Sequence, residues 1–361
     1  MSLRAAVGAE LESFPGDLVP FDVHAHTGTD VDGTTRSSDE HLRALEPIGA
    51  SSVIFPLCVR SGYEAENRRV LEECRRAPER LVPFARLDPR VEGVGRQATE
   101  ALDDGARGFK LHPRSEDFRL DHPGVGAVAA VAAEARVPVL IHAGLGVGSF
   151  GPSILALAQD HPDCPIVLAH AGISDLCWLW EEVPAHPNLF FDTSWWSASD
   201  LIALFSLVPP GRILYGSDAP YMDCEVVLAI TLRCARFAGL STDSLELVAG
   251  GQLRRLLAGE PASDAGPPPG PPQPVVSPLA NRVMTPLIAT GGAKMTGGDP
   301  APMLEMARLA IGDGSSLGES GELVARLLEE GARSTEDAPW SLAFALAVLS
   351  TPGVESPVAL V

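Results

Sequence analysis

Histidines at the ends of apolar runs are the residues of this sequence with the clearest potential for chemistry. His24 and His26 lie two residues apart in FDVHAH, and side chains at positions i and i+2 of a strand point to the same face. His142 and His170 end two further apolar runs, VLIHAG and LAHAG, and Asp218 ends a third in LYGSDAP. Neutral imidazoles and a carboxylate are ligands of a divalent metal ion such as zinc. A single histidine at the end of a strand is explained as a hydrogen-bonded core residue. Four histidines and an aspartate, all at strand ends, instead indicate a metal site.

Such a site predicts chemistry on a polarised carbonyl group. A bound divalent ion lowers the pKa of its water from about 16 to about 7. Asp218 beside the ion can accept the proton of the attacking water. His170 can hydrogen-bond the developing oxyanion, a contact whose removal costs other enzymes roughly 3–4 kcal/mol.

Lys110 and His112 form a second candidate pair in the run GFKLHP. They are two residues apart on a predicted strand, so both side chains can point inward. Lys110 is one of two lysines among the 27 lysine and arginine residues. A buried lysine can release its proton and an arginine cannot, which favours a chemical role for this amine. A composition bias explains the scarcity of lysine equally well. We expect the pair to bind a substrate carboxylate, with a core ion pair as the alternative.

Other polar and aromatic residues follow the ends of the remaining runs and are expected to line the mouth of the site and select the substrate. A solvated loop position is the better interpretation for Arg60, and packing under a loop competes with substrate stacking for Trp195. Asp22 shares a face with His24 and is either an acceptor for an imidazole N–H or a structural residue. The mouth residues are Arg60, Asp88, Asp192, Trp195 and Trp196. The histidines expected in exposed turns or on a helix are His41, His122, His161 and His186.

The elements that must position these residues alternate regularly between residues 18 and 257. Eight β-rich apolar runs alternate with helical stretches such as 64–80 and 125–137, which predicts a parallel sheet. Eight such units match an α/β fold, the (β/α)₈ or TIM barrel, whose catalytic groups lie at the carboxyl ends of the strands. An open doubly wound sheet is disfavoured because no G-x-G-x-x-G follows the first run. The runs span 18–26, 51–57, 80–88, 106–112, 137–144, 164–172, 188–194 and 212–220.

Composition divides the chain into four expected segments. Residues 1–17 form an N-terminal lead-in, and residues 18–260 form the barrel, closed by a helix pair over 241–260. Residues 261–278 read PASDAGPPPGPPQPVVSP, a Pro-rich linker of polyproline type. Residues 279–361 predict a small all-helical C-terminal region that contains no His or Cys and is a poor candidate for chemistry. Its three short helices are expected over 301–312, 319–332 and 338–349.

The charge balance limits the partners. With 27 basic and 47 acidic residues the formal net charge is −20, so the surface repels nucleic acid and anionic membranes. The first twenty residues contain no apolar core of a secretory signal, and no apolar run reaches the roughly 20 residues of a spanning helix. We expect a cytoplasmic protein with a small-molecule substrate. The tail is an appendage, a lid or a contact of a homo-oligomer, and its sequence does not decide among them.

The ordered motifs DVHAH, GFKLHP, VLIHAG, LAHAG and LYGSDAP resemble the amidohydrolase superfamily, in particular its amidohydrolase 2, or amidohydrolase-related, branch. The resemblance covers about residues 18–259 and implies that His24, His26, His142 and Asp218 are metal ligands. His170 would then polarise the substrate or hold a second metal.

In binuclear relatives a lysine at the position of Lys110 is carboxylated and bridges two metals, which is the minority interpretation here. The branch usually works with one ion, so one ion is expected rather than two. Zn²⁺ is the favoured ion, with Mn²⁺ or Fe²⁺ as alternatives.

The branch contains metal-dependent hydrolases and lactonases together with decarboxylases. The expected function is therefore metal-dependent hydrolysis of a small amide, lactone or ester with an acidic group, with Asp218 as proton shuttle. The alternative is non-oxidative decarboxylation of an aromatic or muconate-like acid. A third hypothesis, ranked below both, is that the barrel is catalytically silent and that the helical tail makes the protein an interaction or assembly component.

Overall fold

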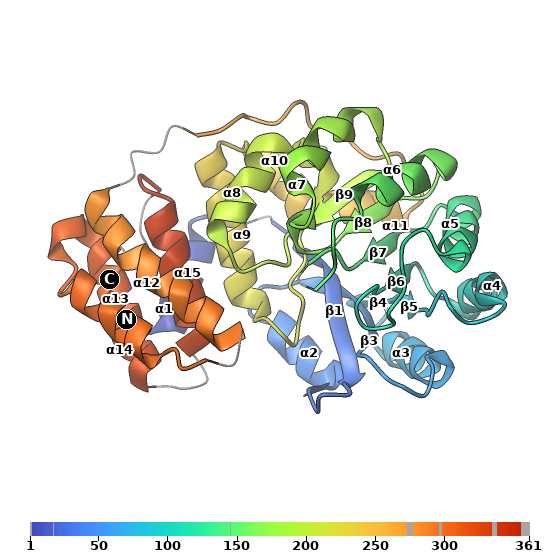
Figure 1. Ribbon diagram of the computed structural model, residues 1–361, viewed down its shortest axis with the longest axis horizontal. Coiled ribbons are helices and arrows are strands. Elements are labelled where there is room, and N and C mark those ends of the chain that lie inside the picture. The colour runs from blue at the N-terminus through green and yellow to red at the C-terminus, as the bar shows by residue number, and fades with distance from the viewer. Residues whose placement is uncertain are drawn as a thin grey trace.

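The eight predicted runs form the eight parallel strands of a barrel in the computed structural model (Figure 1). The structure describes residues 2–16, 18–144, 146–272, 277–295, 298–333 and 338–354. One run is divided at Phe84 into two short strands, β4 and β5. The barrel strands are β1 (Phe21–Thr29), β3 (Ser51–Pro56), β4 (Leu81–Pro83) with β5 (Ala85–Arg86), β6 (Phe109–Leu111), β7 (Val139–Ile141), β8 (Ile166–Leu168), β9 (Leu189–Asp192) and β10 (Ile213–Leu214).

The barrel is assembled from two hydrogen-bonded rows, β2-β1-β3-β4 and β10-β9-β8-β7-β6-β5. At the seam between the first and last strands, the Val23 N–H donates to the Tyr215 carbonyl at 2.9 Å. The His26 N–H donates to the Ala219 carbonyl at 2.7 Å. These bonds place β1 beside β10, as a (β/α)₈ barrel requires. The short β2 (Thr35–Arg36) pairs antiparallel with the end of β1 and was not expected from the sequence.

Side chains of the strands alternate between two apolar clusters. In β7, Leu140 belongs to the barrel interior, whereas Val139 and Ile141 belong to the cluster that the outer helices cover. In β8, Val167 lies in the interior in the same way. Because successive strand residues face opposite sides, the interior set continues at the carboxyl end into polar residues such as His142, which follows β7. The pattern that forms the core therefore also aims the site residues inward.

Helices surround the barrel as the alternation predicts. The expected helices at 64–80 and 125–137 are α3 and α5, and the expected pair over 241–260 is α10 and α11, joined by a π-helical turn. None of the helices in the described part of the chain combines the length and apolar character needed to cross a bilayer. The surrounding helices are α2 (Ser38–Leu45), α3 (Glu64–Arg76), α4 (Val94–Asp104), α5 (Pro123–Ala135), α6 (Gly151–Asp160), α7 (Leu176–Leu179), α8 (Ala198–Leu207), α9 (Cys224–Ala238), α10 (Thr242–Glu246) and α11 (Gln252–Leu257).

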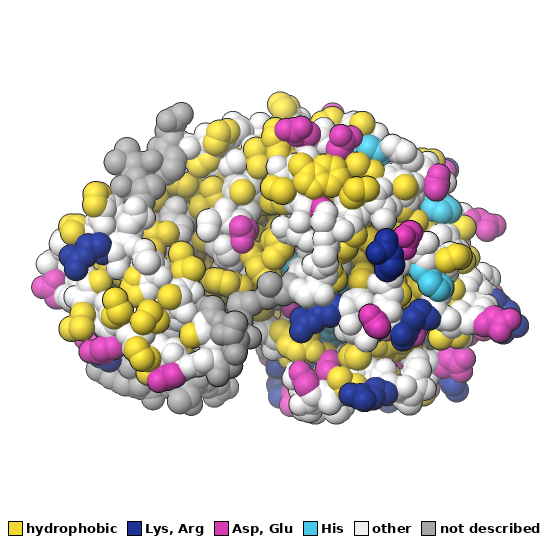
Figure 2. Space-filling view, in the orientation of Figure 1, with side chains coloured by type: hydrophobic (Ala, Val, Ile, Leu, Met, Phe, Trp, Pro, Cys, Tyr) yellow, Lys and Arg dark blue, Asp and Glu magenta, His cyan; other side chains and the backbone are white. Residues whose placement is uncertain are grey.

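The C-terminal helices gather at one end of the molecule beside α8 and α9 (Figure 1). Three were expected and are confirmed, but the longest, α12, was not, and neither was α1 near the N-terminus. On the face shown in Figure 2, charged side chains of both signs are spread over the barrel half. These elements are α1 (Leu3–Glu12), α12 (Pro278–Met295), α13 (Ala301–Ile311), α14 (Gly318–Arg333) and α15 (Ala338–Ser350).

A buried arginine connects this helical group to the barrel. Arg233 of α9 is fully buried, and its Nη1 donates to Glu10 Oε2 of α1 at 2.7 Å. Its Nε donates to Thr351 Oγ1 at 2.7 Å, and its Nη2 donates to the Val354 carbonyl at 3.2 Å. Residues from the N-terminal helix and from the segment after α15 therefore bind the same side chain of a barrel helix.

Candidate metal centre

An irregularity in β1 lies at its first histidine. The register between β1 and β3 shifts between Asp22 and Ala25. Asp22 is fully buried and accepts the backbone N–H groups of His24 and Ser217, each at 2.9 Å, which ties β1 to the loop after β10. Burial raises the pKa of Asp22 to about 7. Of its two interpretations from the sequence, the structure supports the structural one, because both of these bonds come from backbone groups rather than imidazoles.

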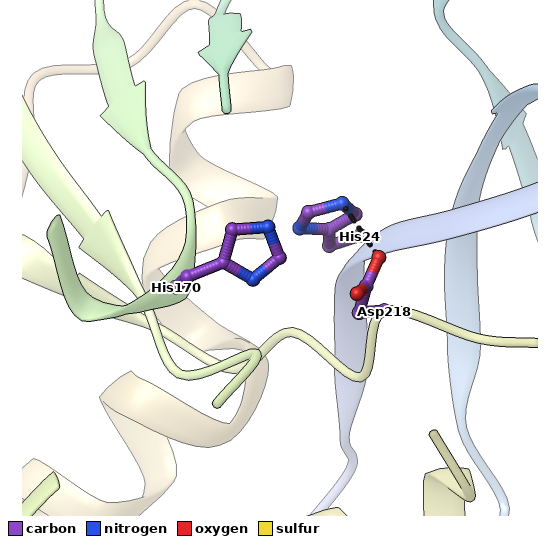
Figure 3. A group of neighbouring side chains, drawn as sticks. All are labelled: His24, His170 and Asp218. Carbon is purple, nitrogen blue, oxygen red and sulfur yellow. Dashed lines mark ion pairs between the residues drawn. The ribbon is translucent and has the colours of Figure 1, made fainter. Parts of the chain in front are cut away.

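The two imidazoles of β1 converge on the carboxylate of Asp218. His24 Nε2 and His26 Nε2 each lie 3.2 Å from Asp218 Oδ1. One ligand atom from each of His24, His170 and Asp218 fits within 4.8 Å of the others. Figure 3 shows the ring of His170 turned toward His24 and Asp218. Residues from β1 and from the ends of β8 and β10 thus meet at one point, although His26 and Asp218 lie 192 positions apart in the chain.

A buried aspartate behind His24 fixes the orientation of its ring. His24 Nδ1–H donates to Asp192 Oδ2 at 2.7 Å, while Asp192 Oδ1 accepts the N–H of His170 at 2.8 Å and that of Ser194 at 2.9 Å. Burial opposes ionisation of Asp192, but the charge and hydrogen bond of His24 lower its pKa to about 2. When the His24 ring is neutral, the bond at Nδ1 leaves its lone pair on Nε2, the atom that faces Asp218. The expectation that Asp192 lines the mouth is wrong, because it is fully buried behind a ligand candidate.

His142 and His170 form a hydrogen-bonded pair on the other side of the site. His170 Nδ1–H donates to the Ser194 carbonyl at 2.7 Å, so its neutral ring carries a lone pair at Nε2. That Nε2 lies 2.9 Å from His142 Nδ1. Burial lowers the pKa of His170, which favours this neutral ring. His170 and Asp218 both have positive φ angles, 58° and 59°, a backbone conformation that clusters at functional sites in residues other than glycine.

Lys110 is fully buried inside the same group. Its Nζ lies 3.1 Å from His24 Nε2 and 5.0 Å from the ring centre of Phe55. Burial lowers the pKa of Lys110 to about 7. His112 stacks on His142 with ring centres 3.9 Å apart and planes 12° from parallel. Lys110 and His112 of GFKLHP therefore contact two different members of the histidine cluster, His24 and His142.

The remaining mouth candidates differ in their distance from this group. The ring of Trp195 lies 6.0 Å from the ring of His170, and its Nε1 donates to Asp200 Oδ2 at 2.7 Å. Arg60 is exposed and lines a separate cavity together with Asp88. Asp88 pairs with Arg90 at 2.9 Å. The structure thus brings Trp195 to the edge of the histidine cluster and places Arg60 elsewhere.

Two histidines expected to be exposed are buried. His41 lies inside α2 with no exposed surface, and its Nε2 is 2.9 Å from Ser52 Oγ on β3. His186 is 5% exposed, and its Nδ1–H donates to the Glu182 carbonyl at 2.7 Å. Each ring forms a hydrogen bond with a partner on a neighbouring segment or turn, Ser52 for His41 and Glu182 for His186. No pattern in the sequence indicates these partners. His122 instead accepts the Gly124 N–H at the start of α5.

The donor set fits a divalent ion. Two imidazole Nε2 atoms face one carboxylate oxygen, and zinc, manganese and iron accept this combination of ligands. The ammonium of Lys110 would compete with a cation, but its lowered pKa allows the neutral amine at neutral pH. Sequence reasoning missed the supporting role of Asp192 and Ser194. Their only signal is the three polar residues that end the apolar run NLFFDTS.

Comparisons with known proteins agree with this fold. The family described as Amidohydrolase matches residues 21–251. A 5-carboxyvanillate decarboxylase from Sphingomonas paucimobilis is 15% identical, with a TM-score of 0.52 over 67% of this chain and 99% of that chain. A manganese-bound 5-carboxyvanillate decarboxylase from Novosphingobium aromaticivorans is 12% identical, with a TM-score of 0.54 over 68% and 99%. An amidohydrolase from Burkholderia multivorans is 18% identical, with a TM-score of 0.54 over 66% and 99%. No curated protein matches the sequence significantly. These structures share the fold.

Proposed function

Because the chain belongs to the amidohydrolase family, we propose that it is a metal-dependent hydrolase of a small amide, lactone or ester that carries an acidic group. One observation carries the proposal. His24 and His26 both approach Asp218 Oδ1 at 3.2 Å, at the carboxyl ends of the first and last barrel strands. Active sites of this barrel type lie at that end of the strands.

We propose His24, His26, His142 and Asp218 as the ligands of one divalent ion. The tautomer that Asp192 imposes on His24 supports this assignment, because the Nε2 lone pair faces the other ligands. Zn²⁺ is the favoured ion, and Mn²⁺ and Fe²⁺ are the alternatives. The manganese bound in one structural neighbour supports Mn²⁺. When bound, the ion would supply an activated water and a Lewis acid for the substrate carbonyl.

Asp218 is the proposed acceptor for the proton of the attacking water. Burial opposes its ionisation, but a protonated His24, through its charge and its hydrogen bond, and the hydrogen bond of His26 hold the pKa of Asp218 well below its usual range. The carboxylate is therefore ionised at neutral pH. The lone pair of His170 at Nε2 suits a metal ligand or a proton acceptor. Stabilisation of an oxyanion by His170 would require the imidazolium form, against the direction of its lowered pKa.

Lys110 and His112 are the proposed partners of the acidic group, and Trp195 is a proposed wall for the substrate. A protonated Lys110 would attract a carboxylate directly beside His24. The same placement favours the second candidate, decarboxylation of an aromatic or muconate-like acid. Several structural neighbours are decarboxylases, among them the two 5-carboxyvanillate enzymes and a 2,6-dihydroxybenzoate decarboxylase. In this reaction a protonated side chain would return a proton to the carbon that loses CO₂.

One assay separates these reactions. The full-length chain, expressed with supplementary zinc or manganese, is tested against lactones, esters and amides with acidic groups, and against aromatic and muconate-like acids. Release of alcohol or amine without CO₂ supports the hydrolase, and release of CO₂ supports the decarboxylase. Absence of bound metal after supplementation contradicts both and favours the silent barrel. We propose that residues 18–260 carry the activity and that the helical region 279–361 carries none.

A further inference from the structure

The loop that begins at the carboxyl end of β9, residues 192–196, is fixed to the metal centre at its start. Asp192 accepts the Nδ1–H of His24 at 2.7 Å. Further along the loop, the Ser194 carbonyl accepts the Nδ1–H of His170 at 2.7 Å. All four of these residues are buried. The first half of the loop therefore has one position, set by two histidines of the site.

Two tryptophans occupy the second half of this loop. The ring of Trp195 lies 6.0 Å from the ring of His170, and the ring of Trp196 lies 6.0 Å from that of Trp195, with the two indole planes 42° apart. Both side chains are half-buried, so part of each indole remains exposed. An aromatic ring binds a substrate best when its orientation is already fixed, because ordering it on binding costs free energy. A substrate wall at Trp195 therefore needs support for the two rings.

Trp196 is supported from outside the barrel by α12. A β-carbon on Gly291 of this helix would lie 3.5 Å from Cη2 and 3.6 Å from Cζ3 of Trp196, which is ordinary van der Waals contact. The indole thus packs on the helix at a residue without a side chain. Atoms beyond a β-carbon would compete with the ring for this space, because packed contacts have little spare volume.

The helix that supports Trp196 is itself packed on the barrel. Val283 and Leu287 of α12 are fully buried and belong to one apolar cluster with buried residues of barrel helix α8. The C-terminal helices lie beside α8 and α9 (Figure 1), and α15 packs against both. The Nε1 of Trp195 donates to Asp200 Oδ2 of the same α8 at 2.7 Å. One indole is thus held by the C-terminal group itself, and the other by a helix on which that group packs.

We propose that the C-terminal helical region is the outer support of the substrate wall. Through Gly291, α12 holds Trp196, and Trp196 in turn holds Trp195 beside His170. Gly291 and Trp196 are positioning residues, and the region supplies no reacting group. The support comes from outside the matched family segment, which ends at residue 251. That Trp195 is a substrate wall rests on the proposed function, whereas the support of the two indoles rests on the contacts alone.

Circular dichroism of the full-length chain tests this support. Two indoles held 6.0 Å apart at one angle couple with each other and give a pair of bands of opposite sign in the ultraviolet. The wild type should show this pair of bands, and Trp196→Phe should abolish it. Gly291→Ala adds only a carbon at contact distance and should keep the bands. Gly291→Val, whose two methyl groups are stiff in a helix and crowd the ring, should remove about half of their amplitude.

Gly8→Val is the matched control, because Gly8 lies in helix α1 and a β-carbon there would meet nothing within 4 Å. Valine favours a helix more than glycine does, so neither valine variant should weaken its own helix. The control should keep the bands of the wild type. Bands of wild-type amplitude in Gly291→Val, or no such bands in the wild type, would overturn the proposal.

Steady-state kinetics with a substrate found in the assay above tests the effect on the wall. Gly291→Val should raise KM roughly three- to tenfold, through partial loss of one wall contact, and leave kcat within about twofold. An unchanged KM in a variant that has lost the bands would refute the role in substrate binding. Because the bands need no turnover, they decide the contact even in a chain that hydrolyses nothing, so a failed contact and a failed activity are told apart.

Discussion

Arg233 and His24 each stand at the centre of a buried network of charged groups, one between helices and one at the barrel mouth. Three guanidinium nitrogens of Arg233 have protein partners, in α1, at the end of α15 and just beyond it. His24 is bonded to Asp192 on one side, while its other nitrogen faces Asp218 and Lys110. The first network joins segments, and the second gathers donor atoms around one point. Buried charge alone therefore does not mark a functional site; convergence of donor atoms does.

Replacement of Asp218 should break the second network with the largest effect on activity. Asp218→Asn keeps the shape but removes the ionised acceptor, and loss of such a group costs about 10²–10⁴-fold in rate. Steady-state kinetics on the substrate class found in the assay above, with thermal unfolding in parallel, measures this. Asp200→Asn, which alters only the partner of Trp195, is the matched control. Activity within tenfold of wild type would remove Asp218 from the proposed mechanism.

Replacement of Arg233 should instead reduce stability and leave the metal centre intact. Arg233→Met leaves Glu10 buried without its ion partner, which typically costs about 3–5 kcal/mol. Adding Glu10→Gln should recover part of that loss, because the uncompensated charge is gone. Urea unfolding gives the free energy, and metal analysis of the folded variant gives the stoichiometry. A folded variant that has lost its metal would show that the two networks are coupled.

Removal of the charge behind His24 should have an intermediate effect. Asp192→Asn weakens the hold on the His24 tautomer, and loss of such supporting partners typically lowers metal affinity about 10–100-fold. Competition with a chelator measures the affinity. Ser194→Ala, which removes a hydroxyl near the same carboxylate, should lower it less. An unchanged affinity in Asp192→Asn would argue against a ligand role for His24.

The two networks also differ in how far the sequence predicts them. Strand periodicity places His24, His26, His170 and Asp218 at carboxyl ends, so barrel geometry alone brings them together. The partners of Arg233 and His41 depend on contacts between helices and strands that no local pattern encodes. The α12 helix was missed because its first residue falls in the Pro-rich segment and Pro286 lies inside it. Local periodicity thus predicts the barrel and the convergence of His24, His170 and Asp218, and fails for long-range polar contacts.

The smallest of these effects concerns pH and lies outside both networks. Burial lowers the pKa of His41 to about 3, from about 6.5 in an unfolded chain. Below pH 6.5 the unfolded chain takes up a proton at this ring that the folded chain excludes, so the stability from His41 is present above pH 6.5 and lost toward pH 3. Relative to His41→Gln, wild type should lose about 2 kcal/mol of unfolding free energy between pH 8 and pH 5. Urea titrations at both values measure this difference. Parallel pH curves for the two proteins would show that His41 takes up a proton as readily in the folded chain as in the unfolded chain, which contradicts the lowered pKa.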